Sequence, residues 1–452
     1  MRRALVLSSL ALTVLACGPR PRPMLIDEDA GVSMELPDAG RQQGMDPPSG
    51  FSVVAEQPVM QGRFGVSVAS APDQFNQPLI AAVWDDPNGD GQRADSRVVF
   101  TRWNGETKAF EMVKTIEVVG EIDLSHPNRQ VSVARDALTG RIGVAYVKPG
   151  TGIRYAFSDD EGANFSLSTV GQDPGAGDPS NPVLALRGGT AHVAYVTSTE
   201  QVLYRTRSGS TGTFSEAQAP ITAGQASAFG PIAMALDSAG TPGLAYFTKG
   251  ASLRGTLAFW RPGSATASPI ADSNMTDVLM PAARRPSVSL VFVGTTPRVA
   301  FHLLRADPVV GMGGAEPMTD SNPELWTSVA SDAMGTSWSA PVGMPRNGNM
   351  VAMRFNSTRW YQGVAVHPNG SVTVAAAYLG NGTTNTLCGG GPKIAKSSDG
   401  QSFTTCVPMN TTYGQSGEWL SLYSHAANKV TLTFFYEQPV MMRNQIVLYR
   451  EP

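Results

Sequence analysis

A short acidic stretch offers the oxygen ligands that calcium prefers. The segment Asp86-Pro87-Asn88-Gly89-Asp90-Gly91 places oxygen-bearing side chains at alternate positions, with glycine available for a sharp turn. The candidate ligands are Asp86, Asn88, Asp90 and Asp95, with Asp85 beside them. Position 12, where a bidentate carboxylate would close the loop, is Arg97. A calcium loop is therefore one interpretation, and an ordinary Asx-Gly hairpin that needs no ion is the other.

The usual catalytic signatures are missing from the sequence. It contains no Gly-x-Ser-x-Gly, no His-Glu-x-x-His and no phosphate-binding glycine loop. The five histidines are scattered along the chain, at His126, His192, His302, His367 and His425. We expect them to be strand or loop residues and not zinc ligands.

Internal repetition is the strongest signal after residue 60. A β-rich run that ends in a small or apolar residue followed by an aromatic one recurs seven times. The pairs are Val83-Trp84, Ala145-Tyr146, Ala194-Tyr195, Ala245-Tyr246, Ala300-Phe301, Ala377-Tyr378 and Phe435-Tyr436. A shorter strand-like run precedes each pair, and Gly, Pro, Asn and Asp mark turns between the runs. Units of about fifty residues with three or four short strands and no helical period predict an all-β propeller.

The repeats also predict how the ring closes. The last repeat contains three strand-like runs, Trp419–Tyr423, Lys429–Tyr436 and Gln445–Arg450. A blade needs four strands, and the run Ser52–Val59 precedes the first repeat without a partner of its own. We therefore expect Ser52–Val59 to be the outer strand of the last blade, where it would cover an open sheet edge. Seven four-stranded blades is the predicted count, with six as the alternative.

One turn in the second repeat carries a recognisable pattern. In the segment 158–165, Ser158, Asp160, Gly162 and Phe165 form Ser-x-Asp-x-Gly-x-x-aromatic between two strand-like runs. Asp160 can accept hydrogen bonds from the turn backbone, Gly162 permits a positive φ, and the ring of Phe165 can pack under the neighbouring strands. The pattern resembles the Asp box, or BNR repeat, of sialidase-like β-propellers. In that family the Asp box is a structural corner, usually distant from the catalytic centre.

Imperfect copies of the box occur in other repeats. Ser397, Asp399 and Phe403 belong to a copy that is one residue short. The copy at 331–338 has Ala333 at the position of the aspartate, and Ser208–Phe214 keeps only the serine, the glycine and the aromatic residue. These copies favour the propeller and carry no chemistry of their own.

The resemblance to sialidases implies where an enzyme's residues would lie. Sialidases hold a substrate carboxylate with three arginines, beside an aspartate acid/base and a Tyr–Glu pair. The matching candidates here are Arg63, Asp85, Arg129, Arg285, Tyr361, Tyr413 and Glu418. The stretch Gly62-Arg63-Phe64-Gly65 stands where the family has Phe-Arg-Ile-Pro, and only its arginine matches. Hydrogen bonding to neighbouring loops would explain these arginines equally well.

Propeller topology assigns the long connections to one face. Loops between second and third strands, and connections between blades, share that face, and the Asp-box corners lie on the opposite one. The longest are Asp85–Ser96, Arg305–Glu324, Pro345–Gln362 and Gly380–Gly391. Because loops of this length are uncommon without a function, this face is the predicted ligand-binding face. Neutral surface drift is the alternative.

The N-terminal region predicts export and a lipid anchor. Arg2 and Arg3 precede an apolar run up to residue 16 that is too short to span a bilayer, which is typical of a signal peptide. The run ends Val14-Leu15-Ala16-Cys17, which resembles a bacterial lipobox. The resemblance implies a diacylated Cys17, and Gly18 after it favours the outer membrane. An ordinary secretory signal with an incidental cysteine is the alternative.

Residues 17–50 are rich in proline and in small and acidic residues, so we expect a disordered tether.

Charge and cysteine content agree with an exported domain over residues 51–452. Removal of Arg2 and Arg3 with the signal peptide leaves 32 basic and 37 acidic residues, a net charge of −5, so no basic field exists for nucleic acid. Besides Cys17, the chain has Cys388 and Cys406, which flank a short predicted hairpin. A disulfide between them is one interpretation, and two reduced thiols the other.

The sequence therefore predicts a seven-bladed, sialidase-like propeller in an outer-membrane lipoprotein, on the periplasmic or the surface side. We expect a monomer whose long-loop face binds a glycan or a protein without turnover. A sialidase-type exo-acting glycoside hydrolase is the alternative.

Overall fold

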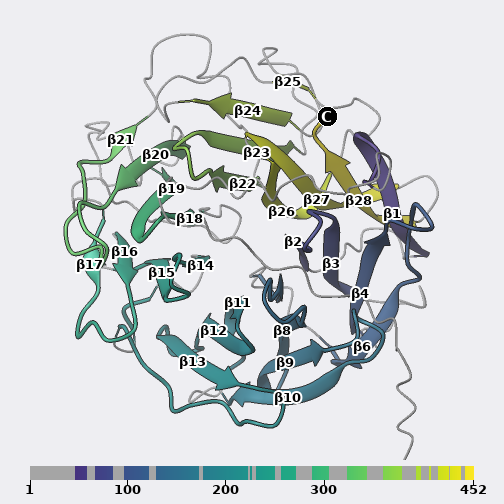
Figure 1. Ribbon diagram of the computed structural model, residues 1–452, viewed down its shortest axis with the longest axis horizontal. Coiled ribbons are helices and arrows are strands. Elements are labelled where there is room, and N and C mark those ends of the chain that lie inside the picture. The colour runs from purple at the N-terminus through teal and green to yellow at the C-terminus, as the bar shows by residue number, and fades with distance from the viewer. Residues whose placement is uncertain are drawn as a thin grey trace, which may run out of the picture.

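The computed structural model describes residues 46–58, 67–84, 96–121, 129–172, 177–221, 224–226, 231–249, 256–270, 288–304, 323–343, 360–378, 393–398, 407–408, 416–426, 428–438 and 443–452. These residues form seven small antiparallel sheets around a central axis (Figure 1). The chain is a seven-bladed β-propeller, as the repeats predict. Residues 1–45 lie outside the described part, so the signal peptide, Cys17 and most of the tether stay predictions.

Each blade is built outwards from an inner strand. The inner strands are β2 (Ser67–Pro72), β7 (Val131–Arg135), β11 (Ser180–Arg187), β14 (Ile232–Leu236), β18 (Val288–Val293), β22 (Trp360–Val366) and β26 (Ser416–Ala426). The second strands are β3 (Pro78–Trp84), β8 (Ile142–Lys148), β12 (Thr190–Val196), β15 (Pro242–Phe247), β19 (Thr296–Leu304), β23 (Val372–Tyr378) and β27 (Lys429–Gln438). Blades are numbered 1 to 7 in this order.

Third and outer strands complete the blades. The third strands are β4 (Arg97–Asn104), β9 (Gly152–Ser158), β13 (Val202–Ser208), β16 (Leu257–Trp260), β20 (Pro323–Val329), β24 (Lys393–Ser397) and β28 (Arg443–Arg450). The outer strands are β5 (Ala109–Phe110) and β6 (Lys114–Val118) in blade 1, then β10 (Ser166–Gly171), β17 (Ser268–Pro269), β21 (Val342–Gly343), β25 (Val407–Pro408) and β1 (Gly50–Pro58).

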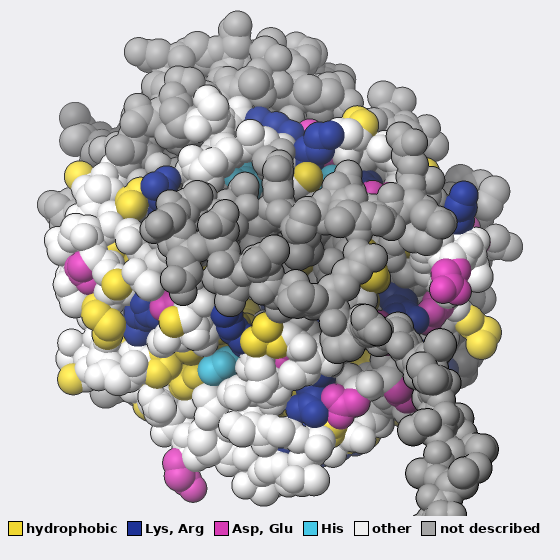
Figure 2. Space-filling model, viewed as in Figure 1, with side chains coloured by type: hydrophobic (Ala, Val, Ile, Leu, Met, Phe, Trp, Pro, Cys, Tyr) yellow, Lys and Arg dark blue, Asp and Glu magenta, His cyan; other side chains and the backbone are white. Residues whose placement is uncertain are grey.

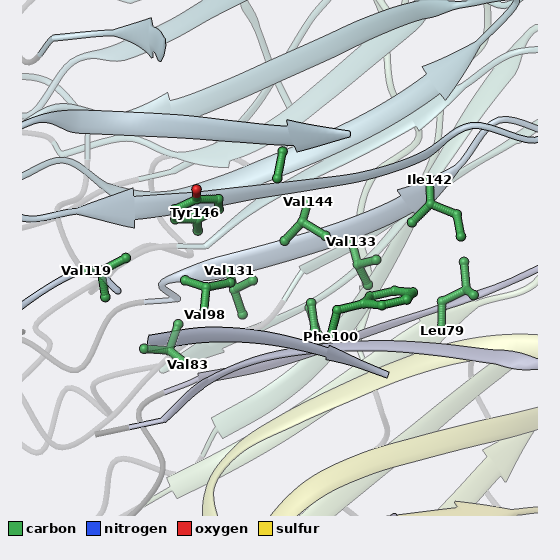
Figure 3. Close-up of a cluster of buried hydrophobic side chains, with 13 residues drawn as sticks. Leu79, Val83, Val98, Phe100, Val119, Val131, Val133, Ile142, Val144 and Tyr146 are labelled. Atoms are coloured by element: carbon green, nitrogen blue, oxygen red, sulfur yellow. The ribbon is translucent and has the colours of Figure 1, made fainter. Parts of the chain in front are cut away.

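The hydrophobic core lies between neighbouring blades, because the second strands β3, β8, β12 and β15 are buried on both faces. The repeated aromatic residue of the second strand is fully buried in several blades, as at Tyr146, Tyr195 and Phe301. Figure 3 shows one such cluster, in which Val83, Val98 and Phe100 of blade 1 face Val131 and Val144 of blade 2, among other residues. Strands buried on both faces explain why the sequence shows short apolar runs more often than strict alternation.

Ring closure follows the predicted scheme. Strand β1 pairs antiparallel with β28, from Gly50 opposite Arg450 to Pro58 opposite Arg443, in the sheet order β1-β28-β27-β26. The backbone N–H of Ser70 in blade 1 also donates to Oγ of Ser421 in blade 7 at 2.8 Å. The outer strand of the last blade therefore comes from the start of the domain, which covers an edge that would otherwise be open.

Inner-strand serines connect further blades in the same manner. Ser67, Ser132 and Ser289 pair with Val83, Ala145 and Ala300, the residues just before the repeated aromatic. Each serine Oγ accepts a hydrogen bond from the next inner segment, at 3.2 Å from the N–H of Gln130, Leu184 and Val366, respectively. These bonds satisfy inner-strand N–H groups that face a neighbouring blade and not their own sheet.

The two faces of the ring differ in their connections. We call the side with the first-to-second-strand turns and the third-to-outer-strand corners the turn face. The opposite side, where second strands end and inner strands begin, is the loop face. Strand ends joined by the four longest connections all lie on the loop face, as the topology predicts. The described chain begins and ends on the turn face, because Gly50 pairs with Arg450 there.

Blade 3 departs from the expected four strands. In its described residues a single bridge between Tyr204 and Gln218 replaces the outer strand. The two backbone bonds of this bridge are both 2.9 Å long. Pro220 lies two residues further on, and because proline has no N–H it cannot extend the ladder.

Within the described ranges, no helix has the length and hydropathy needed to cross a bilayer. On the face drawn in Figure 2, lysine and arginine side chains are interspersed with acidic ones and do not form one basic field.

Candidate ligand-binding site

The Asp-box corner of blade 2 has the geometry that its sequence predicts. Asp160 Oδ1 accepts hydrogen bonds from Ser158 Oγ at 2.7 Å and from the Asn164 N–H at 2.9 Å. The Gly162 N–H donates to Ser158 Oγ at 2.8 Å, and Gly162 has φ +83°. The bond from the Asn164 backbone, followed by those from Ser158 and the Asn164 side chain, lowers the pKa of Asp160 to about 2. These groups satisfy one another, so the corner is a structural element.

The corner also connects two blades. The ring of Phe165 packs edge-on against Phe100 of blade 1, with centroids 5.2 Å apart. Trp338 of blade 5 packs in the same manner on Phe259 of blade 4, at 5.3 Å. The aromatic residue of an Asp box therefore belongs to the interface with the preceding blade.

The copy at residues 331–338 corrects one interpretation of the sequence. Ala333 occupies the position expected for the aspartate, but Asp332 supplies the carboxylate. Asp332 accepts hydrogen bonds from the backbone of Thr336 and Ser337 and from the Thr336 hydroxyl. The carboxylate thus comes from one position earlier in the turn and, like that of Asp160, accepts hydrogen bonds from the turn backbone. In the other copy, Ser397 is buried at the end of β24, and Asp399 and Phe403 lie outside the described residues.

Loop-face chemistry in the described part centres on Glu117 of β6, at the junction of blades 1 and 2. Its Oε2 accepts a hydrogen bond from the Tyr146 hydroxyl at 2.5 Å, and its Oε1 pairs with Lys148 Nζ at 2.5 Å. Arg154 Nε lies 3.3 Å from Oε2. The Arg154 guanidinium also donates to Thr169 Oγ1 at 2.7 Å. Four strands, β6, β8, β9 and β10, thus bring one carboxylate, two cations, a phenol and a hydroxyl together.

The electrostatics of this cluster are those of a stable ion pair. Burial opposes ionisation of Glu117, but hydrogen bonds from Lys148 and Tyr146 and the charge of Arg154 outweigh it, so the pKa of the carboxyl lies below its usual value. Burial and the bond to Glu117 raise the pKa of Tyr146 far above its usual value. Tyr146 is completely buried and stays protonated, so it is a donor to Glu117 and cannot act as a nucleophile.

Polar groups of the cluster still reach solvent. The side chain of Lys148 is 30% exposed, that of Arg154 18% and that of Glu117 13%. A second acid–base pair lies on the same face at the junction of blades 3 and 4, where Lys249 Nζ is 2.7 Å from Glu200 Oε2. In both pairs the glutamate comes from the earlier blade and the lysine lies at or just after the end of the second strand of the later one. We call these two pairs the seam pairs.

Comparison with known proteins places this geometry in context. No protein-family model and no curated protein matches the chain. Among solved structures, the BP39L lectin from Burkholderia pseudomallei is similar over 82% of this chain and 93% of its own, with 13% identity and a TM-score of 0.50. A lectin from Aleuria aurantia is similar over 78% of this chain and 98% of its own, with 13% identity and a TM-score of 0.42.

A sialidase from Trypanosoma rangeli is similar over 90% of this chain and 59% of its own, with 9% identity and a TM-score of 0.44. The propeller fold is shared with the lectin from Burkholderia pseudomallei. At these identities the similarity concerns the fold and not the activity.

Most residues of the predicted sialidase-like set lie outside the described part of this propeller, namely Arg63, Asp85, Arg285 and Tyr413. Tyr361 lies in β22 and Glu418 in β26, but their side chains are not among those described. The predicted set therefore stays a prediction, including the convergence of its three arginines.

Arg129 is the member of the set that the structure places. It precedes the inner strand β7 at the loop face, and its backbone exchanges two hydrogen bonds with Asn181 of blade 3. Burial lowers the pKa of its guanidinium, and no carboxylate among the described residues offsets that effect.

The predicted metal and disulfide sites also lie outside the described residues. This applies to Asp86, Asn88, Asp90 and Asp95 and to Cys388 and Cys406. The described residues contain no group of three or more His, Cys, Asp or Glu side chains arranged to hold a metal ion. His192 and His425 lie in strands, and His367 directly follows β22.

Sequence reasoning missed the seam pairs. Glu117 and Lys148 are far apart in the chain and belong to different blades, so no local spacing connects them. The available signal was positional, because Lys148 and Lys249 each follow the repeated aromatic residue by two or three positions. A search for charged residues at equivalent repeat positions would have found the lysines and left the glutamates unassigned.

Proposed function

We propose that this chain is a lipid-anchored cell-envelope protein whose propeller binds a glycan on its loop face without turning it over. The observation that carries the proposal is the pair of partly exposed Glu–Lys contacts at the blade junctions of that face. Such groups lie in or beside strands of neighbouring blades, are held by their ion pairs and still offer hydrogen bonds to a polar ligand.

Glycan hydroxyls suit this arrangement because each can donate and accept a hydrogen bond. At the blade 1–2 junction, Glu117 would accept from a hydroxyl while Lys148 and Arg154 donate, as charge-assisted bonds of more than average strength. Their positions are fixed before binding, since Tyr146 and Thr169 hold Glu117 and Arg154, and preorganisation lowers the entropic cost of binding. The fold similarity to a protein named as a lectin is consistent with this use of a propeller.

Binding without turnover fits the described carboxylates. Glycoside hydrolysis by the usual route needs two carboxyl groups about 5 to 10 Å apart, flanking the substrate. Glu117 is held in an ion pair, and the phenol beside it is buried. The observation favouring the alternative, a sialidase-type hydrolase, is the charge of Arg129 at the start of the inner strand β7. Among the described residues no carboxylate offsets the effect of its burial, so it would attract a carboxylate-bearing sugar.

The anchor part of the proposal rests on the sequence. A diacylated Cys17 would hold the mature chain at the outer membrane, on its periplasmic or surface side. We propose that the domain acts there as a monomer.

The test is a glycan-array screen with the full-length protein, followed by titration of the strongest ligand. Glu117→Gln should weaken that ligand tenfold or more, because a hydrogen bond to a charged group contributes about 1.5–3 kcal/mol. The matched control is Glu111→Gln on the outer edge of the same blade, where the carboxylate pairs with Arg102 at 2.9 Å. Unchanged affinity in Glu117→Gln would exclude this junction as the site, and an array without any bound glycan would contradict the function. Release of sugar from a fluorogenic sialoside would favour the hydrolase instead.

A further inference from the structure

Large exposed apolar side chains lie at tips of the turn face. Phe75 is 53% exposed in the turn between β2 and β3, and Leu138 is 54% exposed in the turn between β7 and β8. Met334, at the corner of blade 5, is 45% exposed. Turn tips usually carry polar or small residues, so large apolar side chains at such positions suggest a surface that they contact.

The first two tips lie side by side and are firmly held. Asp73 Oδ1 accepts hydrogen bonds from the Phe75 N–H at 2.7 Å and from the Gln77 N–H at 2.8 Å. Asp136 Oδ1 holds the Leu138 N–H in the equivalent way at 2.9 Å. A 3.0 Å bond from Arg135 to Gln74 joins the first turn to blade 2. The two side chains are therefore presented together on rigid supports.

The chain enters the domain beside these tips. Asp46 Oδ2 lies 3.5 Å from Arg450 Nη2, and Arg450 Nη1 donates to the carbonyl oxygen of Asn76 at 2.8 Å. Asn76 follows Phe75 directly. Because β1 starts at Gly50 on the turn face, the described chain enters the propeller on that side.

We infer that the turn face around Phe75 and Leu138 rests on the bilayer surface to which Cys17 is attached. The inference rests on the lipid anchor of the proposed function. It goes further, because it states which face meets the lipid and that the loop face, with its seam pairs, points away from it.

The anchor alone would not fix this orientation. The 28 residues from 18 to 45 can extend at most about 100 Å, which is enough to let any face approach the membrane. Burial of the apolar tips among the lipid headgroups selects one orientation, since removing apolar surface from water is favourable.

The contact should be apolar and not ionic. Charged groups near the tips pair with one another, as Arg102 with Glu161 at 2.6 Å and Arg141 with Asp159 at 2.7 Å. Among the described residues, Lys108 and Lys429 are exposed on this face, but two separate lysines do not make the basic cluster that attracts anionic lipid. Docking should therefore occur on zwitterionic phosphatidylethanolamine–phosphatidylcholine vesicles. It should also persist in 0.5 M salt. The Debye length there is about 4 Å, between ~8 Å at 0.15 M and ~3 Å at 1 M, so interactions between surface charges are strongly screened.

The experiment compares lysine acetylation on the full-length lipidated protein in such vesicles and in detergent micelles. Lys108 and Lys429 are exposed on the turn face, and Lys249 is exposed on the loop face. Vesicles should slow acetylation of Lys108 and Lys429 several-fold and leave Lys249 unchanged. Equal rates at both faces in vesicle-bound protein, or protection of Lys249, would overturn the docking and leave the anchor intact. Protein absent from the vesicle fraction would overturn the anchor as well.

Two variants isolate the apolar tips. The double variant Phe75→Ser with Leu138→Ser should remain in the vesicle fraction through its lipid but lose the protection of Lys108 and Lys429. Val118→Ser is the matched control, because Val118 is 50% exposed at the loop-face end of β6. Protection that survives the double variant, or that Val118→Ser abolishes equally, would overturn the assignment of Phe75 and Leu138.

Discussion

Gly162 in the corner of blade 2 lies directly against the ring of Phe100 in blade 1. A Cβ atom at Gly162 would be 2.5 Å from Phe100 Cε1, well inside van der Waals contact. Gly335 in blade 5 has the same relationship to Phe259 in blade 4. The glycine of the Asp box therefore serves two purposes, a left-handed backbone conformation and close packing between blades.

Gly162→Ala should destabilise the propeller for both reasons. A positive φ is strained for alanine, and the added methyl group overpacks the interface with Phe100, which together should cost about 2–4 kcal/mol. The matched control is Gly150→Ala, since Gly150 has φ +68° and open space around its Cβ position. Chemical denaturation of both variants separates the two effects. Equal losses of stability would show that the contact with Phe100 adds nothing.

Ring closure predicts opposite outcomes for two truncations. Removing residues 1–49 leaves β1 intact and should change the melting temperature little. Removing residues 1–59 exposes the edge of β28 and the apolar side chains beneath β1, where Phe51 packs against Tyr449 with centroids 4.9 Å apart. The shorter protein should aggregate or unfold without a cooperative transition. Identical melting curves for the two proteins would contradict the role of β1.

Much of this fold was predictable, because each blade of a propeller repeats the same local arrangement of short strands and turns. The repeated aromatic residue near the end of the second strand is buried for the same reason in blades 2 to 5, at Tyr146, Tyr195, Tyr246 and Phe301. Strand β1 closes the ring as expected. The partners of Glu117 and the substitution of Asp332 for the missing aspartate were not predictable. They depend on contacts between blades and on a one-residue shift within a turn, and neither leaves a periodic signal.

The lipid anchor makes a separate prediction. A diacylated Cys17 would be the attachment of the mature chain to the membrane, so Cys17→Ala should move the domain out of the lipid-bound form. Metabolic labelling with a fatty acid and fractionation of cells expressing either protein would measure this. An unlabelled wild-type protein, or a labelled variant, would contradict lipidation at Cys17.

Calcium should stabilise the protein if the segment from Asp86 to Asp95 binds it. Extracellular calcium modules have dissociation constants of roughly 0.1–1 mM. A ten- to hundredfold excess of ion should therefore add about 1–3 kcal/mol by mass action. The thermal midpoint should rise with calcium, rise less with magnesium, and fail to respond in Asp90→Ala. A wild-type midpoint that is indifferent to both calcium and chelator would leave an ordinary Asx-Gly turn.

Three buried histidines should make the propeller sensitive to mild acid. Burial lowers the pKa of His192 and of His367 to about 4 and that of His425 to about 3. The positive charge of Lys396 also lowers the pKa of His367. The charges of Arg450, Lys429 and Lys396 do the same for His425. Each ring is neutral and hydrogen-bonded, as His192 is to the Tyr204 hydroxyl at 2.7 Å and His367 Nε2 is to Thr373 Oγ1 at 2.9 Å.

Unfolded histidine binds a proton near pH 6.5, so below that pH the unfolded state takes up protons that the folded state does not. The stabilising contribution of the neutral rings is complete above pH 6.5 and is lost as the pH falls towards 4. Each histidine should remove about 1.4 kcal/mol of unfolding free energy per pH unit in that window.

Denaturation between pH 7 and 5 measures the slope, before most carboxylates titrate. His192→Gln keeps a partner for Tyr204 and should reduce the slope by about one third. A flat slope in the wild type would show that these histidines bind protons equally well in the folded and unfolded states, and an unchanged slope in the variant would show this for His192.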